Sequence, residues 1–134
     1  MAESQSFYVN EIATPLAGQR MERKLFRFAK KSLRTKGVRR GVKEVCKCIR
    51  RGMQGIVIFA ADVSPVDVIS HIPVKCENQR LPYVFVKSRA ELGLAAGTAR
   101  PTSVVLLQQP PEDSPLHAKY LKLHERLAGS LPLL

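Results

Sequence analysis

The chain has 134 residues, with 22 Lys and Arg against 11 Asp and Glu and a formal net charge of +11. This length fits a single domain, and an apolar content of 45% is enough for an ordinary hydrophobic core, which excludes a disordered chain. The charge favours a polyanionic partner or a basic membrane contact and says little about the fold.

The positive charge is concentrated in one part of the chain. From Arg20 to Arg51, fourteen Lys and Arg stand against two Glu, a net of +12, whereas the remaining residues have a net of −1. A basic segment of this kind is typical of a nucleic-acid footprint. The odd number of three Cys suggests no disulfide framework and favours a reducing compartment. Residues 1–10 do not resemble a signal peptide, so we expect a soluble intracellular protein.

The predicted elements alternate between helices and strands. In chain order they are a flexible tail at 1–10, a helix at 18–35, a short strand at 38–40, a helix from 41 to 52, a strand at 56–61, a helix begun by Ser64 and Pro65 that restarts after Pro73 and reaches 78, a strand at 83–86, a helix from Ser88 to 97, a strand at 103–107, a linker at 110–115 and a helix at 116–128. Three of the strands are apolar throughout, which is typical of a sheet covered on both faces. We therefore expect one α/β domain over 11–128, with a mixed sheet and a C-terminal tail at 129–134.

The second helix has the most informative pattern. Its apolar positions Val42, Val45, Cys46 and Ile49 form one stripe, and Lys43, Lys47 and Arg50 lie on another face. Gly41 puts no side chain before the first free N–H groups of the helix, and Arg39 and Arg40 stand beside them. A helix N-terminus of this kind suits a phosphate, so we interpret it as the end that meets RNA.

Other chemistries find less support in the sequence. Cys76 and His71 could supply a nucleophile and a base, but no orienting acid or oxyanion motif accompanies them. Cys46 and Cys48 with Cys76 and His71 could be counted as metal ligands, yet a Cys-x-Cys pair on a helix points its thiols in different directions. A membrane-surface role would need the apolar face of the first helix, which the core requires. We expect no catalytic residue, no metal, no cofactor, no small-molecule substrate and no membrane contact.

Five motifs occur in an order that resembles a known family. They are Arg39-Arg40-Gly41-Val42-Lys43-Glu44-Val45, then 56–62 with Ser64-Pro65, then His71-Ile72-Pro73-Val74-Lys75-Cys76-Glu77, then Leu81-Pro82-Tyr83-Val84-Phe85-Val86, and last Leu92-Gly93 through Ala96-Gly97 with Arg100-Pro101-Thr102. Together they resemble the kink-turn RNA-binding family of archaeal and eukaryotic ribosomal and small nucleolar ribonucleoproteins, over about residues 10–107. The resemblance implies a three-layer α/β/α sandwich with about four strands.

The resemblance also implies where RNA would bind. The family holds a bent stem–internal loop–stem with the start of the second helix and two neighbouring loops. By position, Gly41, Lys43, Glu44 and Lys47 would lie beside tandem sheared G·A pairs. The remaining family positions surround an extruded nucleotide: Val68 would pack near it, Arg89 and Arg100 would flank it, and Thr98 and Ala99 would form the loop over the RNA.

Glu44 is unusual among these cations because a carboxylate repels phosphate. It makes sense as an acceptor for the N1–H or N2–H of a guanine in a non-Watson–Crick pair. The alternative is an ordinary helical ion pair with Arg40 or Lys47, which contributes only about 0.3–0.5 kcal/mol.

The sequence departs from strict kink-turn binders at Lys43, where they carry Asn, and at Ser64, where several carry Glu. Lys reads a base edge less sharply than a planar amide, so we expect weaker discrimination between RNAs. The box H/ACA subgroup shares the Lys. This resemblance implies a non-catalytic subunit that holds a guide RNA for pseudouridylation of ribosomal and spliceosomal RNA in the nucleolus. The implied partners are a pseudouridine synthase and a small scaffold protein, whose contact we expect at 103–107 and the terminal helix. The alternative is a kink-turn binder of the box C/D particle, spliceosome or ribosome.

Overall fold

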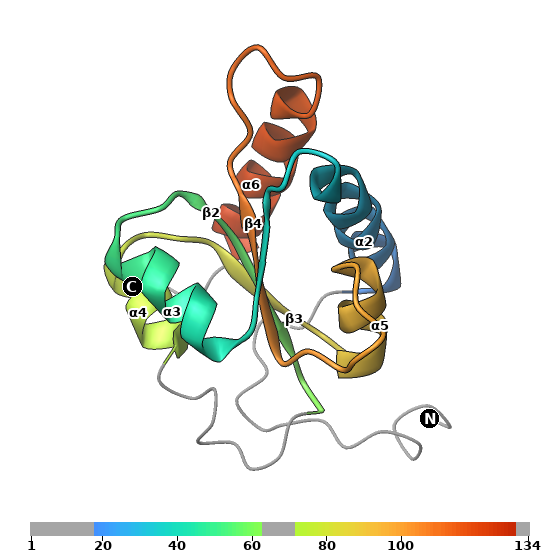
Figure 1. Ribbon diagram of the computed structural model, residues 1–134. Coiled ribbons are helices and arrows are strands. Elements are labelled where there is room, and N and C mark those ends of the chain that lie inside the picture. Colours follow the sequence, from blue (N-terminus) through green and yellow to red (C-terminus); the bar gives the residue numbers. More distant parts are fainter. Residues whose placement is uncertain (1–17, 63–71, 131–134) are drawn as a thin grey trace.

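A computed structural model describes residues 18–62 and 72–130 (Figure 1). Within these residues the chain forms five helices and four strands. In order they are α2 (Gln19–Leu33), β1 (Val38–Arg40), α3 (Val42–Arg50), β2 (Gly55–Ala60), α4 (Ile72–Asn78), β3 (Tyr83–Val86), α5 (Arg89–Ala95), β4 (Val104–Gln108) and α6 (His117–Ser130). The predicted tail at 1–10, the helix start at Ser64 and Pro65, Val68 and His71 lie outside the described residues.

The four strands form one mixed sheet in the order β1-β4-β2-β3. β4 runs antiparallel to both β1 and β2, and β2 runs parallel to β3. The parallel pair places Phe59 beside Phe85, whose rings stack with centroids 5.0 Å apart. All residues of β2 and β3 are buried, as their continuous apolar sequence predicts for a sheet covered on both faces.

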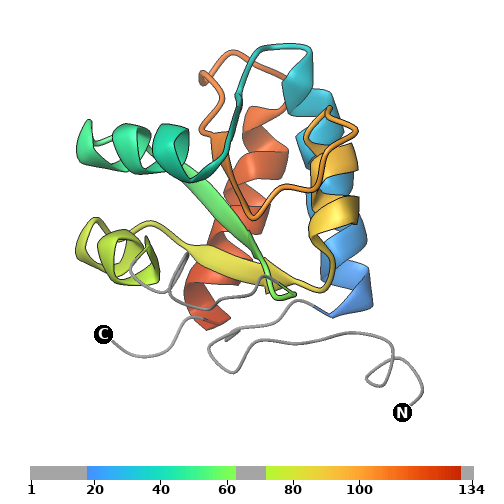
Figure 2. The same cartoon turned by 60° about the horizontal axis from the view of Figure 1, so that its bottom comes forward.

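Helices cover the sheet on both sides (Figure 2). Helices α3 and α4 lie on one face, and α2, α5 and α6 lie on the other. Each helix turns a buried stripe toward the sheet. In α2 this stripe is Leu25, Phe28, Ala29 and Ser32, and in α6 it includes Tyr120, Leu123 and Leu127. The three-layer α/β/α sandwich is confirmed.

The observed helix limits differ from the predicted ones by a few residues. α2 ends at Leu33 rather than 35, because Lys36 takes a left-handed conformation with φ 58° and the Gly37 N–H donates back to the Ser32 carbonyl. α6 continues to Ser130, two residues beyond the predicted limit of 128. No helix in the described part of the chain is long and apolar enough to cross a membrane.

The predicted partner contact at 103–107 is wrong for its strand. β4 lies between β1 and β2, and Val104, Val105, Leu106 and Leu107 are all fully buried. A strand that is hydrogen-bonded on both edges and covered on both faces has no surface for another protein. β4 occupies this central position because it pairs in antiparallel fashion with β1 and β2, which are distant in sequence. A local apolar pattern does not reveal which strands will be neighbours. α6, the other half of that prediction, is on the surface of the molecule.

Candidate nucleic-acid interface

The N-terminus of α3 is open. Gly41 precedes the helix with φ 92°, a conformation that favours glycine, and no side chain caps the helix within the described chain. A Cβ built on Gly41 would meet no described atom within 4 Å. The Gly41 N–H donates to the Val104 carbonyl at 3.0 Å, which fixes the turn to the sheet. Among the described residues, no side chain therefore caps the first N–H groups of α3, which leaves them available to an anionic ligand.

The first turns of α3 separate an anchored face from an exposed one. Val45 and Ile49 are buried against the sheet, whereas Lys43, Glu44 and Lys47 are exposed. Glu44 is thus neither sealed in the core nor covered by the described chain.

Cys48 was not part of the predicted apolar stripe, yet it is buried. Burial raises the pKa of its thiol, and the Glu44 carboxylate raises it further, while the Arg39 guanidinium acts in the opposite direction. Arg39 is half-buried in β1, and its Nε is buried without a hydrogen-bond partner among the described residues. Arg39 therefore lies partly under α3 and less in the solvent than the sequence suggested.

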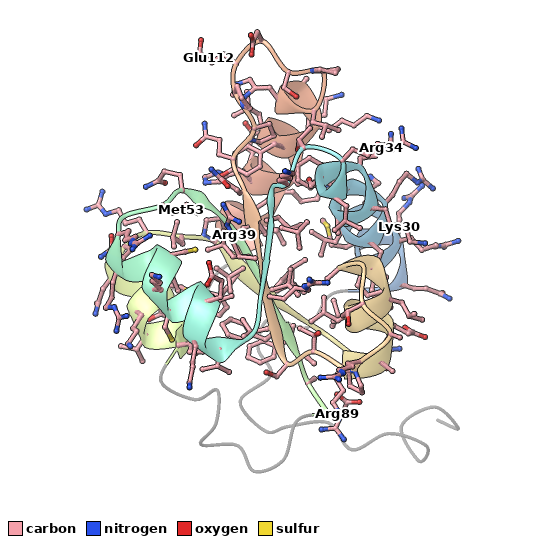
Figure 3. All side chains as sticks on the ribbon, in the orientation of Figure 1. Lys30, Arg34, Arg39, Met53, Arg89 and Glu112 are labelled. Atoms are coloured by element: carbon pink, nitrogen blue, oxygen red, sulfur yellow. The ribbon has the colours of Figure 1, made fainter. Side chains whose placement is uncertain are left out.

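Arg40 connects two segments that are distant in sequence. Its Nη1 donates to the Ala96 carbonyl at 3.1 Å, at the end of α5. This bond holds the β1–α3 turn beside the loop that joins α5 to β4 (Figure 3). The sequence predicted Arg40 only as a phosphate ligand. The structure gives it a positioning role as well, which no local pattern indicates.

The α5–β4 loop carries Thr98, Ala99 and Arg100. Thr98 is half-buried and its Oγ1 accepts from the Arg100 N–H at 3.2 Å, while Ala99 and Arg100 are exposed. The loop packs closely on α5, because a Cβ on Gly93 would lie 2.2 Å from the Arg100 carbonyl oxygen. An isolated glycine inside a helical pattern is the sequence signal for such an approach.

Arg89 begins α5 and is exposed at the same end of the molecule (Figure 3). Its N–H donates to the Asp62 Oδ1 at 3.0 Å, and its carbonyl accepts from the Thr102 N–H at 3.0 Å. Ser88 caps the helix by accepting from the Glu91 N–H, as predicted. Asp62 is a positioning residue that the sequence analysis missed, although an Asp directly after a buried strand was the available signal.

The structure thus brings the α3 end and the α5–β4 loop together, with Arg89 nearby. Gly41, Lys43, Glu44 and Lys47 come from one side, and Thr98, Ala99 and Arg100 from the other. Val68, which would pack near an extruded nucleotide, lies outside the described residues.

The alternative chemistries considered for the cysteines also involve His71, which lies outside the described residues. Cys46, Cys48 and Cys76 are free and buried, and no cluster of three or more His, Cys, Asp or Glu in the described ranges could hold a metal ion. Burial raises the pKa of the Cys76 thiol to about 12, so almost none of it is thiolate near neutral pH.

Fold and surface together define a class: an α/β/α sandwich domain whose open cationic helix end, paired with a basic loop, suits a structured nucleic acid. The chain belongs to the ribosomal protein L7Ae/L30e/S12e/Gadd45 family, whose pattern matches residues 23–117. The resemblance drawn from the five motifs is therefore confirmed.

Curated relatives agree with this assignment. The chain is 50% identical over 106 residues to the H/ACA ribonucleoprotein complex subunit 2-like protein of Xenopus tropicalis, covering 79% of this chain and 70% of that one. It is 44% identical over 124 residues to the H/ACA ribonucleoprotein complex subunit 2 of Pongo abelii, covering 92% and 80%. A solved structure, the Giardia lamblia 15.5kD RNA binding protein, superposes with a TM-score of 0.82 at 26% identity, over 92% of this chain and all of the other.

Proposed function

We propose that this protein is a non-catalytic RNA-binding subunit of the box H/ACA ribonucleoprotein. In that particle it would hold a guide RNA for pseudouridylation of ribosomal and spliceosomal RNA and so contribute to ribosome biogenesis. The proposal is supported by relatives in vertebrates and in Arabidopsis thaliana named as subunit 2 of the H/ACA complex or as subunit 2-like proteins, at 44–50% identity.

The observation that carries the RNA-binding role is the exposed Glu44 on the open end of α3. A nonspecific phosphate-binding surface gains nothing from an acid among cations, because the carboxylate repels the backbone. An acid does fit a base edge that presents N–H donors, such as a guanine whose Watson–Crick edge is unpaired. Lys43 and Lys47 on the same exposed side would neutralise the phosphates around it.

The α5–β4 loop would form the second side of the RNA site. Arg40 ties this loop to the α3 end, so both would meet the same bent RNA as one preformed surface. Arg89 and Arg100 would contact the backbone beside the extruded nucleotide, with Thr98 and Ala99 over it. A site that is already assembled loses less entropy when RNA binds.

The partners and the location belong to the same proposal. We infer that the subunit acts beside a separate pseudouridine synthase chain and a small scaffold protein, in the nucleolus. The chemistry would reside in the synthase, and this subunit would place the guide RNA over it.

The experiment that tests the assignment is sequencing of the RNA that copurifies with the tagged full chain from cells. We expect mainly box H/ACA guide RNAs. The comparison is the double variant Lys43→Glu and Lys47→Glu. It should lose most of that RNA and keep the fold, since both side chains are exposed. Recovery mainly of box C/D guides, spliceosomal RNA or ribosomal RNA would overturn the H/ACA assignment.

A further inference from the structure

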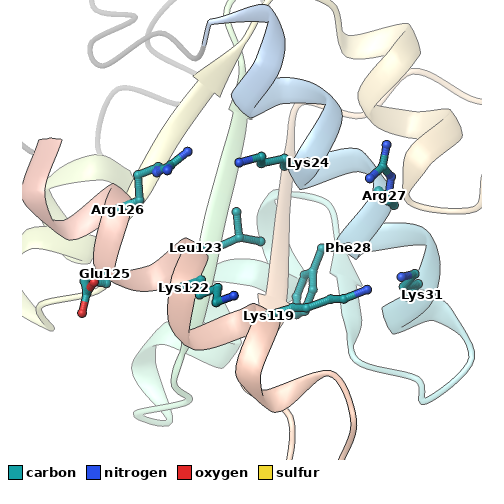
Figure 4. A pocket seen from close by; sticks show the side chains of 9 residues that line it. All are labelled: Lys24, Arg27, Phe28, Lys31, Lys119, Lys122, Leu123, Glu125 and Arg126. Atoms are coloured by element: carbon teal, nitrogen blue, oxygen red, sulfur yellow. The ribbon is translucent and has the colours of Figure 1, made fainter.

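A second basic surface lies on the sheet face opposite α3. Helices α2 and α6 pack side by side there and leave a groove of about 540 Å³ between them (Figure 4). It is lined by Lys24, Arg27, Phe28, Lys31, Lys119, Lys122, Leu123, Glu125 and Arg126. Six cations against one acid give the groove a formal charge of +5. None of these residues belongs to the proposed RNA surface.

The cations form two matching rows. On α2 they occupy positions i, i+3 and i+7, at Lys24, Arg27 and Lys31, and α6 repeats the same spacing at 119, 122 and 126. Such spacing puts each row on one side of its helix, and seven residues of helix extend about 10 Å. The side chain of Glu125 points away from α2, so the space between the rows is almost purely cationic (Figure 4).

The floor of the groove is apolar. It is made by Phe28 and Leu123, which join the two helices together with Tyr120, whose ring lies 6.2 Å from that of Phe28. Phe28 is only 2% exposed, so it offers no ring face on which a base could stack. Leu123 is only 7% exposed as well, so the groove presents mainly the charged ends and aliphatic stems of Lys and Arg, which favours an anionic ligand with some apolar surface.

The two rows also approach one another, and Glu125 is the one acid among the described residues that line the groove. Hydrogen bonding and charge repulsion from Lys119 lower the pKa of the Lys31 ammonium, and Arg27 and Arg34 add to the effect. An acid placed between Lys31 and Lys119 would relieve this repulsion.

We propose that the groove receives an acidic amphipathic helix of a partner protein. The helix would direct Asp or Glu on its two flanks toward the two cationic rows and lay its apolar stripe between them, on the aliphatic stems of those Lys and Arg side chains. This is the helix-in-groove mode of peptide recognition, here with charge on both sides of the seam. The inference rests on the α2–α6 geometry and stands apart from the RNA-binding role of α3.

A designed peptide provides the test. The probe is a fluorescein-labelled peptide of about four to five helical turns with a Leu stripe flanked by Glu, since shorter isolated helices are marginal in water. Its control carries Gln at every Glu. Binding to the full chain is followed by anisotropy, for the native protein and for the double variant Lys31→Glu and Lys119→Glu. The matched protein control is Arg23→Glu with Lys30→Glu, which makes the same change of charge at two exposed α2 residues that do not line the groove.

We expect the groove variant to weaken peptide binding by about tenfold or more and the matched control by less than about twofold. Carbodiimide cross-linking of the peptide to the native protein should join it to Lys24, Lys31, Lys119 or Lys122, which keeps the test independent of any variant's folding. The proposal is overturned by equal loss in both variants, by equal binding of the Gln peptide, by cross-links confined to α3, or by a groove variant that loses RNA affinity instead of peptide affinity.

Discussion

At the scale of single residues, Arg40 is the side chain whose role changed most between sequence and structure. Its Nη1 bond to the Ala96 carbonyl fixes the α5–β4 loop against the α3 end. Arg40→Met keeps the aliphatic stem and removes the donor. We expect a loss of about 0.5–1.5 kcal/mol in the free energy of unfolding and faster hydrogen exchange of the loop amides, measured by mass spectrometry.

The control for this variant is Arg50→Met, which removes another exposed charge, from the last turn of α3. It should leave loop exchange unchanged. Equal exchange in native protein and Arg40→Met would mean that the hydrogen bond does not position the loop.

Cys76 gives a prediction about pH. Burial raises the pKa of its thiol from 9.0 to about 12, so between these values the folded state keeps a proton that the unfolded chain releases. The contribution of this thiol to stability is therefore fully present below pH 9. As the pH rises from 9 toward 12 it is lost, and the free energy of unfolding falls by at most about 1.4 kcal/mol per pH unit.

Urea unfolding between pH 9 and 10 measures this effect before most tyrosines ionise in the unfolded chain. The free energy of unfolding should fall less steeply with pH for Cys76→Ala than for the native protein. Parallel slopes would show that Cys76 does not hold its proton in the folded state.

At the scale of elements, Gly93 shows how closely α5 and its following loop are fitted. An added Cβ would lie 2.2 Å from the Arg100 carbonyl oxygen, which is backbone and cannot turn aside. We expect Gly93→Ala to lower the free energy of unfolding by about 1–3 kcal/mol, as overpacking does, and to weaken RNA binding through the displaced loop.

The matched control is Gly18→Ala at the start of α2, where φ is −71° and no described atom lies within 4 Å of the new Cβ. Its effect in thermal and urea unfolding should stay below about 1 kcal/mol. A Gly93→Ala protein as stable as Gly18→Ala would contradict the close approach.

The elements themselves could be predicted from the sequence, and their arrangement only in part. Continuous apolar runs identified β2 and β3, and Ser88 identified the start of α5. Strand order depends on which distant edges pair, so the central place of β4 was not predicted and the partner contact assigned to its residues was wrong. The local periodicity of apolar residues predicts which face of a strand is buried, but it does not predict which other strand will pair with it.

At the scale of the whole molecule, the charge analysis was also incomplete. The sequence located the basic segment at Arg20 to Arg51, but the fold divides that segment between opposite faces of the sheet. α3 takes its cations to one face, while Lys24, Arg27 and Lys31 meet the cations of α6 on the other. The α6 cations lie outside that segment, in the remaining residues of the chain, whose net charge is close to zero. Only the packing of α2 on α6 brings the two sets together.

The whole fold also shows which parts of the proposed RNA surface could be inferred from local sequence. Its first side is continuous in sequence, from Arg39 to Lys47, so helical spacing and the position of Gly41 were sufficient. Its second side depends on long-range contacts made by Arg40, Gly93 and Asp62. The sequence analysis predicted none of those contacts, and it placed the second side only through the family resemblance.

The account depends most on Glu44 as a reader of a noncanonical base pair at the open end of α3. The direct measurement is the affinity of Glu44→Ala for two RNAs of equal length, a stem–internal loop–stem with tandem G·A pairs and a fully paired duplex. The control is Glu112→Ala, an exposed acid at the far end of the molecule (Figure 3). We predict that Glu44→Ala weakens binding to the looped RNA by about tenfold, equivalent to one lost base contact, and leaves duplex binding unchanged or slightly tighter. Equal changes for both RNAs, or an effect no larger than that of Glu112→Ala, would contradict the account.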